Sequence, residues 1–194
     1  MMKSKRFQQA FIYAYDLHAD QKRKGKDVPY ISHLMGVAAL VLEHGGTENQ
    51  AIAALLHDAV EDQGGKPTLK EIRKRFGDEV ADIVEGCTDA ETEPKPEWRG
   101  RKEKYIAHLR EAGPSVRLVA AADKLYNART ILEDYRNVGD HVWERFLGGK
   151  DGTLWYYRSL ANTLREIGPS TLADELGRVV SELEQLVREA DAAQ

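Results

Sequence analysis

The sequence predicts an all-α protein, a compact bundle of about eight to ten helices. Apolar residues recur at the spacing of one helix face through most of the chain. Pairs of helix-breaking residues separate these stretches, as at Gly45-Gly46 and Gly113-Pro114. Neither the alternating pattern of a strand nor an internal repeat is evident. We therefore expect helices that are joined by loops and packed at irregular angles.

The helices expected in the first half of the chain begin at capping residues and end at breakers. In a capping box, a Thr side chain and a later Glu or Gln satisfy free backbone N–H groups at the start of a helix. In order, the expected helices are one around 7–14, one near 31–44, one opened by the capping box of residues 47–50 and running through His57 towards Gly64, a short one opened by the box of residues 68–71, and one capped by Asp78. A polar loop with Gly25 and Pro29 separates the first two helices.

The second half of the chain begins with a polar stretch, residues 88–97, which contains Pro94 and Pro96 and is expected to form a loop. The helices expected after it are one carrying Trp98 to Leu109, a long one capped by Ser115 and running through Arg129, one with Trp155 and Leu164, and a C-terminal amphipathic helix within 169–194. The length of 194 residues fits one domain, 1–194.

Composition narrows the classes of protein to which the chain can belong. Hydrophobic residues make up 42% and charged residues 31%, which allows a sizeable core under a well-solvated surface. The net charge of −4 argues against a nucleic-acid binder, although Lys22-Arg23-Lys24 forms a local basic run. No segment resembles a membrane span or a signal peptide. The single cysteine, Cys87, excludes an internal disulfide, and we expect a cytoplasmic protein.

A cluster of ionisable residues ends an otherwise apolar stretch, 52–56. On one helix, His57 and Glu61 would share a face, and Asp58 and Asp62 would share another about 100° round. The apolar residues before the cluster indicate that the helix is buried where the cluster begins. Three carboxylates and an imidazole beside a core are unfavourable unless a cation compensates them. The cluster therefore predicts one part of a metal site.

Further ligands must come from other segments, because one helix cannot surround a metal ion. His33 opens a helix with an apolar face, and Asp123 follows the apolar run 119–122. With His57 and Asp58 they provide two imidazoles and two carboxylates, a donor set that suits Mn²⁺, Fe²⁺, Zn²⁺, Co²⁺ or Ni²⁺. Among these ions, phosphate chemistry at open coordination positions favours Mn²⁺.

Each of these residues also has a purely structural interpretation. Alone, His33 is compatible with a core histidine bonded to a carbonyl, and Asp123 with a buried salt bridge to a basic residue of its own helix. Alone, Glu61 and Asp62 are compatible with a solvated helix end. The metal ligands taken together, in this order along the chain, favour the metal site.

The remaining histidines are not assigned to the metal site. His44 follows His33 by a distance of roughly 16 Å along a helix, so one ion cannot contact both. His18, His108 and His141 have no partner pattern nearby and are expected at the surface.

The order His33, His57-Asp58, Asp123 resembles that of the HD superfamily of metal-dependent phosphohydrolases. Further segments are similar to the hydrolase domain of the Rel/Spo alarmone enzymes, and most of all to the stand-alone small alarmone hydrolases. These segments are QKRK at 21–24, PYISH at 29–33, AALLHDAVED at 53–62, FG at 76–77 and ADKLYNAR at 122–129. The similar stretch covers about residues 5–165. Glu61-Asp62 and the ADKLYN segment are more specific than the His-Asp pair itself.

The resemblance implies a helical HD-domain fold, an activity and a role for each matching residue. The implied reaction removes the 3′-pyrophosphate from guanosine tetra- or pentaphosphate with Mn²⁺ as cofactor. The implied metal ligands are His33, His57, Asp58 and Asp123, and the residues implied to orient or deprotonate the attacking water are Glu61 and Asp62. The implied substrate contacts are Arg23, Lys24 and Asn127. A further phosphate-binding residue is implied, which is Lys95, Arg101 or Lys102. Tyr126 and Tyr157 would pack near the sugar or base unless they belong to the core.

The chain departs from the family pattern in places, and other functions stay open. Leu34 follows His33 where the family commonly has proline, and residues 94–102 match only loosely. One alternative is an HD phosphohydrolase that acts on another nucleotide or on a phosphorylated dinucleotide cofactor. Another is an HD module that senses a nucleotide without turnover, against which the presence of Glu61 and Asp62 argues. A small-molecule nucleotide is the expected partner, rather than a nucleic acid or a membrane, and the oligomeric state stays open.

Overall fold

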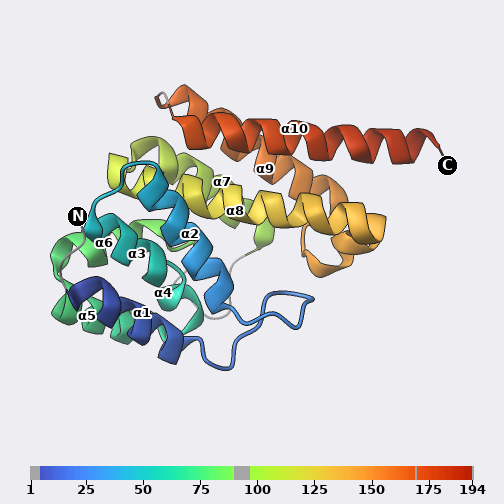
Figure 1. Ribbon diagram of the computed structural model, residues 1–194. Helices are drawn as coiled ribbons and strands as arrows, with labels where there is room; N and C mark the ends of the chain where they lie inside the picture. Colours follow the sequence, from blue (N-terminus) through green and yellow to red (C-terminus); the bar gives the residue numbers. More distant parts are fainter. Residues whose placement is uncertain (1–4, 90–96, 169, 194) are drawn as a thin grey trace. The chain divides into compact units, whose positions relative to one another are not determined.

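The computed structural model describes residues 5–89, 97–168 and 170–193 (Figure 1). These residues form ten α-helices and one 3-10 helix, and the only β pairing among them is an isolated antiparallel bridge between Lys22 and Pro29. The all-α prediction is confirmed. The elements are α1 (Lys5–Leu17), α2 (Ile31–Glu43), α3 (Glu48–Leu56), α4 (Ala59–Asp62), α5 (Gly65–Phe76), α6 (Asp78–Cys87), α7 (Trp98–Glu111), α8 (Pro114–Val138), η1 (Gly139–Arg145), α9 (Gly149–Glu166) and α10 (Thr171–Ala192).

The chain divides into two compact units. The first comprises Met1–Pro96 with Ala112–Asp123, and the second comprises Glu97–Glu111 with Lys124–Gln194. The long helix α8 contributes its residues up to Asp123 to the first unit and the rest to the second. No described helix has the combination of length and hydrophobicity that crossing a bilayer requires. The expectation of one functional domain, 1–194, stays a prediction.

Helix α3 forms the centre of the first unit. All its residues from Ala51 to Leu56 are buried, and it packs against α1, α2 and α6, which Figure 1 shows gathered around it. Three of the buried residues are alanines, whose small side chains let neighbouring helices approach closely. The predicted capping box at its start is confirmed, because Thr47 accepts a hydrogen bond from the Gln50 backbone N–H and the Gln50 side chain accepts one from the Thr47 backbone N–H.

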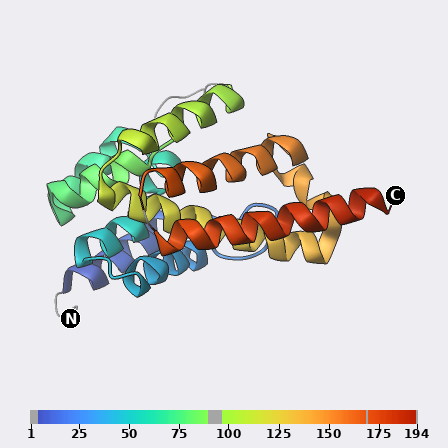
Figure 2. The ribbon, with the colours of Figure 1, turned by 90° about the horizontal axis from the view of Figure 1, so that it is seen from above.

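In the second unit, α9 packs against α7, η1 and α10. Figure 2 shows α9 and α10 running side by side. Helix α10 begins at a cap, since the Ser170 side chain accepts a hydrogen bond from the Ala173 backbone N–H. Its buried residues recur every three or four positions, and they are Leu172, Ala173, Leu176, Gly177, Val180, Leu183 and Val187. This single buried face is that of an amphipathic helix.

Several helix boundaries in the first unit differ from those expected. Asp78 and Ser115, which were expected to cap helices, lie instead within α6 and α8. The helix expected to run past His57 is interrupted, because α3 ends at Leu56 and α4 begins at Ala59. The Ala54 carbonyl, which the next helical turn would use, accepts a hydrogen bond from the His57 ring at 2.8 Å. The capping box expected to open at Thr68 is also wrong, because α5 already begins at Gly65 and Thr68 donates its hydroxyl hydrogen bond to the Gln63 carbonyl.

Candidate metal centre

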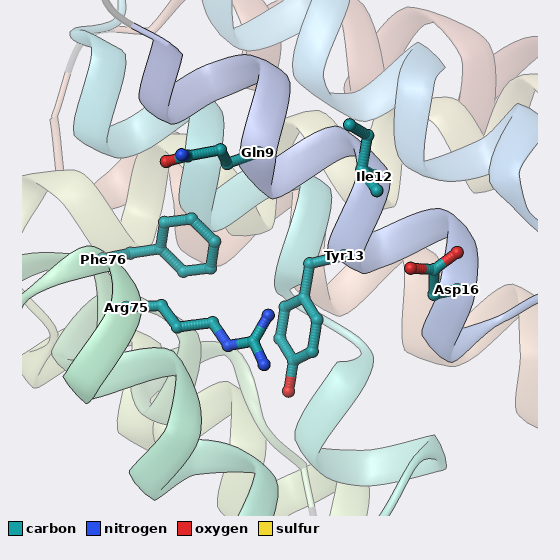
Figure 3. A pocket seen from close by; sticks show the side chains of 6 residues that line it. All are labelled: Gln9, Ile12, Tyr13, Asp16, Arg75 and Phe76. Carbon is teal, nitrogen blue, oxygen red and sulfur yellow. The ribbon is translucent and has the colours of Figure 1, made fainter.

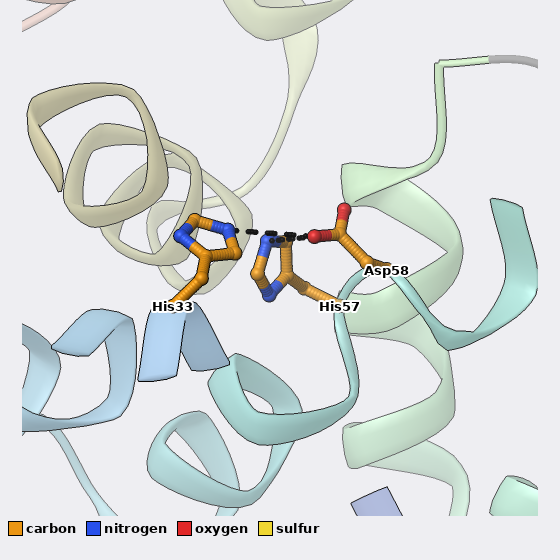
Figure 4. Close-up of side chains that lie close together, drawn as sticks. All are labelled: His33, His57 and Asp58. Atoms are coloured by element: carbon orange, nitrogen blue, oxygen red, sulfur yellow. Dashed lines mark ion pairs between the residues drawn. The ribbon is translucent and has the colours of Figure 1, made fainter. Parts of the chain in front are cut away.

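Three separate segments of the first unit bring the predicted metal ligands together. His33 lies in the first turn of α2, His57 and Asp58 form the turn between α3 and α4, and Asp123 lies on α8. Figure 4 shows His33, His57 and Asp58 pointing toward one another. The two imidazoles are almost fully buried, and the Asp58 side chain is 20% exposed. Residues far apart in the sequence thus meet at one edge of the core.

The distances between these side chains are short. The His57 Nε2 atom lies 3.1 Å from Asp58 Oδ2 and 3.6 Å from Asp123 Oδ1. The His33 Nε2 atom lies 3.4 Å from Asp58 Oδ2 and 3.3 Å from Asp123 Oδ1. One nitrogen from each imidazole therefore faces one oxygen from each carboxylate.

This arrangement fits a bivalent transition-metal ion. Ligand atoms about 2.1 Å from one ion lie roughly 3.0 Å apart at octahedral angles and roughly 3.4 Å apart at tetrahedral angles. The separations of 3.1–3.6 Å between the nitrogens and oxygens agree with such a common centre. The His33, His57 and Asp58 ligand atoms all lie within 4.8 Å of one another. The mixed nitrogen and oxygen donors suit the ions from Mn²⁺ to Zn²⁺.

The orientation of the His57 ring supports the same conclusion. Its Nδ1 atom lies 2.8 Å from the Ala54 carbonyl, and because a carbonyl only accepts, Nδ1 carries a proton and donates it. In the neutral imidazole, Nε2 then presents a lone pair towards the carboxylates. This buried Nε2 makes no hydrogen bond of acceptable geometry with another described residue. A nitrogen held in this way is suited to ligate a metal ion.

Opposite charges dominate the electrostatics of the cluster. Burial lowers the pKa of His57, but the Asp58 and Asp123 carboxylates outweigh burial and raise that pKa well above its usual range. Burial likewise raises the pKa of Asp58, but the neighbouring imidazoles outweigh burial and hold that pKa well below its usual range. A cation at the centre therefore competes with the protons that these groups share.

Tyr30 supports Asp58 from the loop before α2. Its hydroxyl donates a 2.6 Å hydrogen bond to Asp58 Oδ2, the oxygen that faces both imidazoles. Its ring stacks on His18, with ring centroids 5.1 Å apart, and meets His33 edge to face at 5.5 Å. Burial and the nearby carboxylates of Asp58 and Asp62 raise the pKa of Tyr30, so its hydroxyl stays protonated and remains a donor.

The two predicted catalytic carboxylates follow the metal residues on α4. The Asp62 backbone N–H donates to the Asp58 carbonyl at 2.9 Å, so Asp62 lies one helical turn beyond Asp58. Glu61 is half-buried, and its Oε2 atom accepts a hydrogen bond from the Asp89 backbone N–H at 3.4 Å. Asp62 is exposed, and its Oδ2 atom accepts one from Gln21 Nε2 at 2.8 Å. Both carboxylates therefore have partners in the first unit.

Arg23 and Lys24 lie in a loop closed by backbone hydrogen bonds. The Arg23 N–H donates to the Val28 carbonyl at 2.8 Å, and the Tyr30 N–H donates to the Gln21 carbonyl at 2.9 Å. Gly25 adopts a φ of 70°, which permits the tight turn. The Arg23 guanidinium lies 5.5 Å from the centroid of the Tyr30 ring, whose hydroxyl contacts Asp58. Lys24 is exposed.

The other predicted substrate contacts belong to the second unit or lie outside the described residues. Lys95 is one of the residues that the structure does not describe. Asn127 is half-buried on α8, one helical turn after Asp123. Tyr157 is buried on α9, with its ring 5.6 Å from that of Tyr156. Of the alternative phosphate-binding residues, Lys102 lies with its Nζ atom 4.8 Å from the centre of the Tyr156 ring.

Besides Tyr30, sequence reasoning missed three polar residues near the predicted metal ligands. His18 was expected at the surface but is only 2% exposed, because Tyr30 stacks on it and Gln21 accepts its hydrogen bond. Gln21 and Gln63 were not singled out, although Gln63 Nε2 donates to Gln21 Oε1 at 2.7 Å. A His three residues before a Gln was the one available signal, and it is weak.

A surface pocket between α1 and α5 is separate from this cluster. Figure 3 shows its lining, which is Gln9, Ile12, Tyr13, Asp16, Arg75 and Phe76. The Arg75 guanidinium lies 4.4 Å from the centroid of the Tyr13 ring and bonds to Glu71. None of the predicted site residues lines this pocket, and its one basic group is already engaged. The candidate site is therefore the cluster of predicted metal ligands.

Comparison with known proteins identifies a matching family and similar proteins. A protein family described as HD domain matches residues 10–154. The guanosine-3′,5′-bis(diphosphate) 3′-pyrophosphohydrolase MESH1 of Xenopus tropicalis is 41% identical over 126 residues, which cover 63% of this chain and 68% of the relative. A probable guanosine-3′,5′-bis(diphosphate) 3′-pyrophosphohydrolase of Synechocystis sp. is 39% identical over 129 residues, which cover 63% of this chain and 16% of that longer relative.

A solved structure extends the similarity to the fold. It is that of a metazoan orthologue of SpoT that hydrolyses ppGpp, and it superposes with a TM-score of 0.77 over 94% of this chain and 97% of the other. Its sequence is 24% identical, so this likeness concerns the fold alone.

Proposed function

The chain belongs to the HD domain family, and from this premise we propose that it is a metal-dependent phosphohydrolase that removes the 3′-pyrophosphate from guanosine tetra- or pentaphosphate. The resemblance to alarmone hydrolases inferred from the motifs is confirmed by the relatives that carry this name. The proposal rests chiefly on the convergence of two imidazoles and two carboxylates in a chain of this family. Their nitrogen and oxygen atoms lie 3.1–3.6 Å apart.

His33, His57, Asp58 and Asp123 would hold the ion, which we propose to be Mn²⁺. When bound, such an ion lowers the pKa of a coordinated water and polarises a phosphoryl oxygen. The contribution of the chain is to fix the ligands in place. The Ala54 carbonyl orients the His57 ring, and the Tyr30 hydroxyl orients the Asp58 carboxylate.

Glu61 and Asp62 would act on the attacking water. Both follow the ligand pair His57-Asp58 by one helical turn, and neither needs to be a ligand itself. A carboxylate beside such a water orients it and accepts its proton, which makes the oxygen a better nucleophile for the phosphorus atom.

Basic and aromatic side chains would recognise the substrate. Arg23 lies over the ring of Tyr30, whose hydroxyl bonds to Asp58, which supports a role of this loop in binding phosphate next to the ligands. Arginine suits this role because its guanidinium forms paired hydrogen bonds with phosphate oxygens. We assign the remaining proposed contacts to Lys24, Lys95, Asn127 and Tyr157. The single cysteine supports a reducing compartment, and we propose the cytoplasm.

A turnover screen tests this function. Protein loaded with Mn²⁺ is incubated with guanosine tetraphosphate and a panel of nucleotides, including 5′-monophosphates and phosphorylated dinucleotide cofactors, and released pyrophosphate and phosphate are measured. The expected result is guanosine diphosphate and pyrophosphate from guanosine tetraphosphate. His57→Ala should abolish the reaction. Turnover of simple 5′-monophosphates without turnover of guanosine tetraphosphate would overturn the substrate assignment, and binding of nucleotides without any turnover would indicate a sensor.

A further inference from the structure

Gln21 lies where three polar side chains of the first unit meet. Its Nε2 atom donates a 2.8 Å hydrogen bond to Asp62 Oδ2. Its Oε1 atom accepts one from His18 at 2.6 Å and one from Gln63 Nε2 at 2.7 Å. A side-chain amide has one acceptor and one donor end, and both ends are engaged here. Gln21 therefore has a defined orientation, with its amide hydrogens directed at the carboxylate.

The identities of the partners make this orientation unambiguous. Asp62 as a carboxylate only accepts, so the atom of Gln21 that faces it must be the nitrogen. The amide oxygen then faces His18 Nδ1, which must donate. Burial lowers the pKa of His18, and its Gln21 bond opposes this effect only in part. A neutral His18 with its single proton on Nδ1 matches the contact.

The same group of residues is joined to the metal ligands. His18 stacks on Tyr30 at 5.1 Å, and Tyr30 donates to Asp58. Gln63 follows Asp62 directly and holds the amide oxygen of Gln21 from the end of α4. The backbone of Gln21 also accepts a hydrogen bond from the Tyr30 N–H at 2.9 Å. Gln21 is thus held both through its side-chain amide and through its backbone.

We infer that Gln21 is a positioning residue, held by His18 and Gln63, that fixes the Asp62 carboxylate for its action on the attacking water. This inference rests on the proposed function. Asp62 is exposed, and a donor of fixed direction favours one orientation of its carboxylate. Gln21 would not touch the substrate or the ion, and its effect on kcat would pass through Asp62.

The test compares variants that remove different parts of the contact. Gln21→Met removes both ends of the amide, whereas Gln21→Glu keeps an acceptor for His18 and Gln63 but loses the donor to Asp62. Both should lower kcat for guanosine tetraphosphate by about 10- to 100-fold, with little change in KM and in Mn²⁺ affinity. Gln8→Met makes the same chemical change at an exposed site on α1 and should leave kcat unchanged. Thermal unfolding verifies that each variant is folded, and if Gln21→Met unfolds, Gln21→Glu carries the test.

A double variant separates positioning from a general structural effect. If Gln21 acts through Asp62, adding Gln21→Met to Asp62→Ala causes no further loss of kcat. A double variant whose fold-loss of kcat equals the product of the two single losses would overturn the inference. Full activity of both Gln21 variants, or of Asp62→Ala, would overturn it as well. In each of these cases wild-type turnover leaves the proposed function standing. No turnover by the wild-type protein would overturn the proposed function and this inference together.

Discussion

At the scale of single residues, one oxygen atom connects the candidate ligands with their supports. Asp58 Oδ2 faces the Tyr30 hydroxyl at 2.6 Å, His57 Nε2 at 3.1 Å and His33 Nε2 at 3.4 Å. A carboxylate oxygen that binds a metal ion keeps capacity for a hydrogen bond, and the Tyr30 hydroxyl uses it. Tyr30 therefore limits the rotation of Asp58 without occupying a coordination position.

Removal of the Tyr30 hydroxyl should weaken the metal site. We expect Tyr30→Phe to reduce Mn²⁺ affinity by about tenfold or more, because Asp58 loses the donor that orients it. Isothermal titration calorimetry measures the affinity. Tyr15→Phe, at an exposed position on α1, is the matched control and should bind as the wild type does. Equal affinities in the two variants would contradict the role given to Tyr30.

Glu61 and Asp62 should separate metal binding from turnover. We expect Glu61→Ala and Asp62→Ala to keep most Mn²⁺ affinity, since neither side chain belongs to the proposed ligand set. Turnover of guanosine tetraphosphate should fall by about 10²- to 10⁴-fold, the usual contribution of general base catalysis. Glu43→Ala, which removes an exposed carboxylate at the end of α2, serves as the control. If both variants kept near wild-type rates, the base would lie elsewhere.

The ligand candidates could be predicted from the sequence, whereas their supports could not. His57 and Asp123 emerge from apolar runs, so a buried ionisable group was evident at each. Gln21 and Tyr30 lie in a polar loop, where neutral polar residues are ordinary. The hydrogen bonds that engage them come from residues up to 42 positions away, and no local pattern records such pairing.

At the scale of elements, the start of α3 is the best-defined helix terminus in the first unit. Both hydrogen bonds of the capping box are present, and they satisfy backbone groups that would otherwise face water. Because α3 is largely buried and ends at Leu56, directly before His57, its stability affects the placement of the candidate ligands directly.

Thr47→Ala should therefore destabilise the protein. We expect a loss of about 1 kcal/mol in the free energy of unfolding, the usual effect of deleting an N-cap hydroxyl. Urea denaturation followed by circular dichroism measures it. The control is Thr130→Ala within α8, where the hydroxyl only bonds to the Tyr126 carbonyl of its own helix. A loss in Thr130→Ala as large as that in Thr47→Ala would refute the capping explanation.

Helix existence was more predictable than helix boundaries. Paired glycines end helices because they adopt backbone angles that other residues avoid, as Gly45 does with a φ of 76°. The break after Leu56 depends instead on the hydrogen bond from the His57 ring to the Ala54 carbonyl, which apolar spacing cannot indicate. Helix α5 begins before Thr68 because Pro67 is well suited to a first turn, where its missing N–H needs no partner.

At the scale of the whole molecule, a bound ion would connect segments that are distant in the chain. The proposed ligands extend from His33 to Asp123, and all belong to the first unit. An ion that binds the folded chain and not the unfolded chain stabilises the fold by mass action. The gain is about 2.7 kcal/mol when the free ion exceeds its dissociation constant a hundredfold.

Thermal unfolding should reveal this linkage. At such an excess of Mn²⁺, we expect the unfolding midpoint to rise by about 5 to 10 °C and to return to its starting value with a chelator. His57→Ala should show little response to the ion, which distinguishes the proposed site from general binding to acidic side chains. Differential scanning calorimetry measures both midpoints. Equal shifts in the two proteins would exclude His57 as a ligand.

The helical class of the molecule was predictable, but its division into two compact units was not. Apolar spacing shows which face of a helix is buried without showing which helices share a core. Helix α8 illustrates the difficulty, since its apolar residues continue from Val119 through Leu125 while the chain passes from one unit to the other.

The closed loop before α2 also bears on how this protein can be changed by mutation over generations. Backbone pairing of Arg23 with Val28 separates the tip of the loop from Gln21 and Tyr30 at its base. We expect replacements at Lys24, Lys26 and Asp27 to leave that pairing and the side chains below it intact, provided that Gly25 keeps its φ of 70° in the turn. If this loop binds the substrate as proposed, nucleotide preference can diverge at the tip while the hydrolytic residues are inherited unchanged, and the tip positions other than Gly25 are the ones to randomise when selecting for a new substrate.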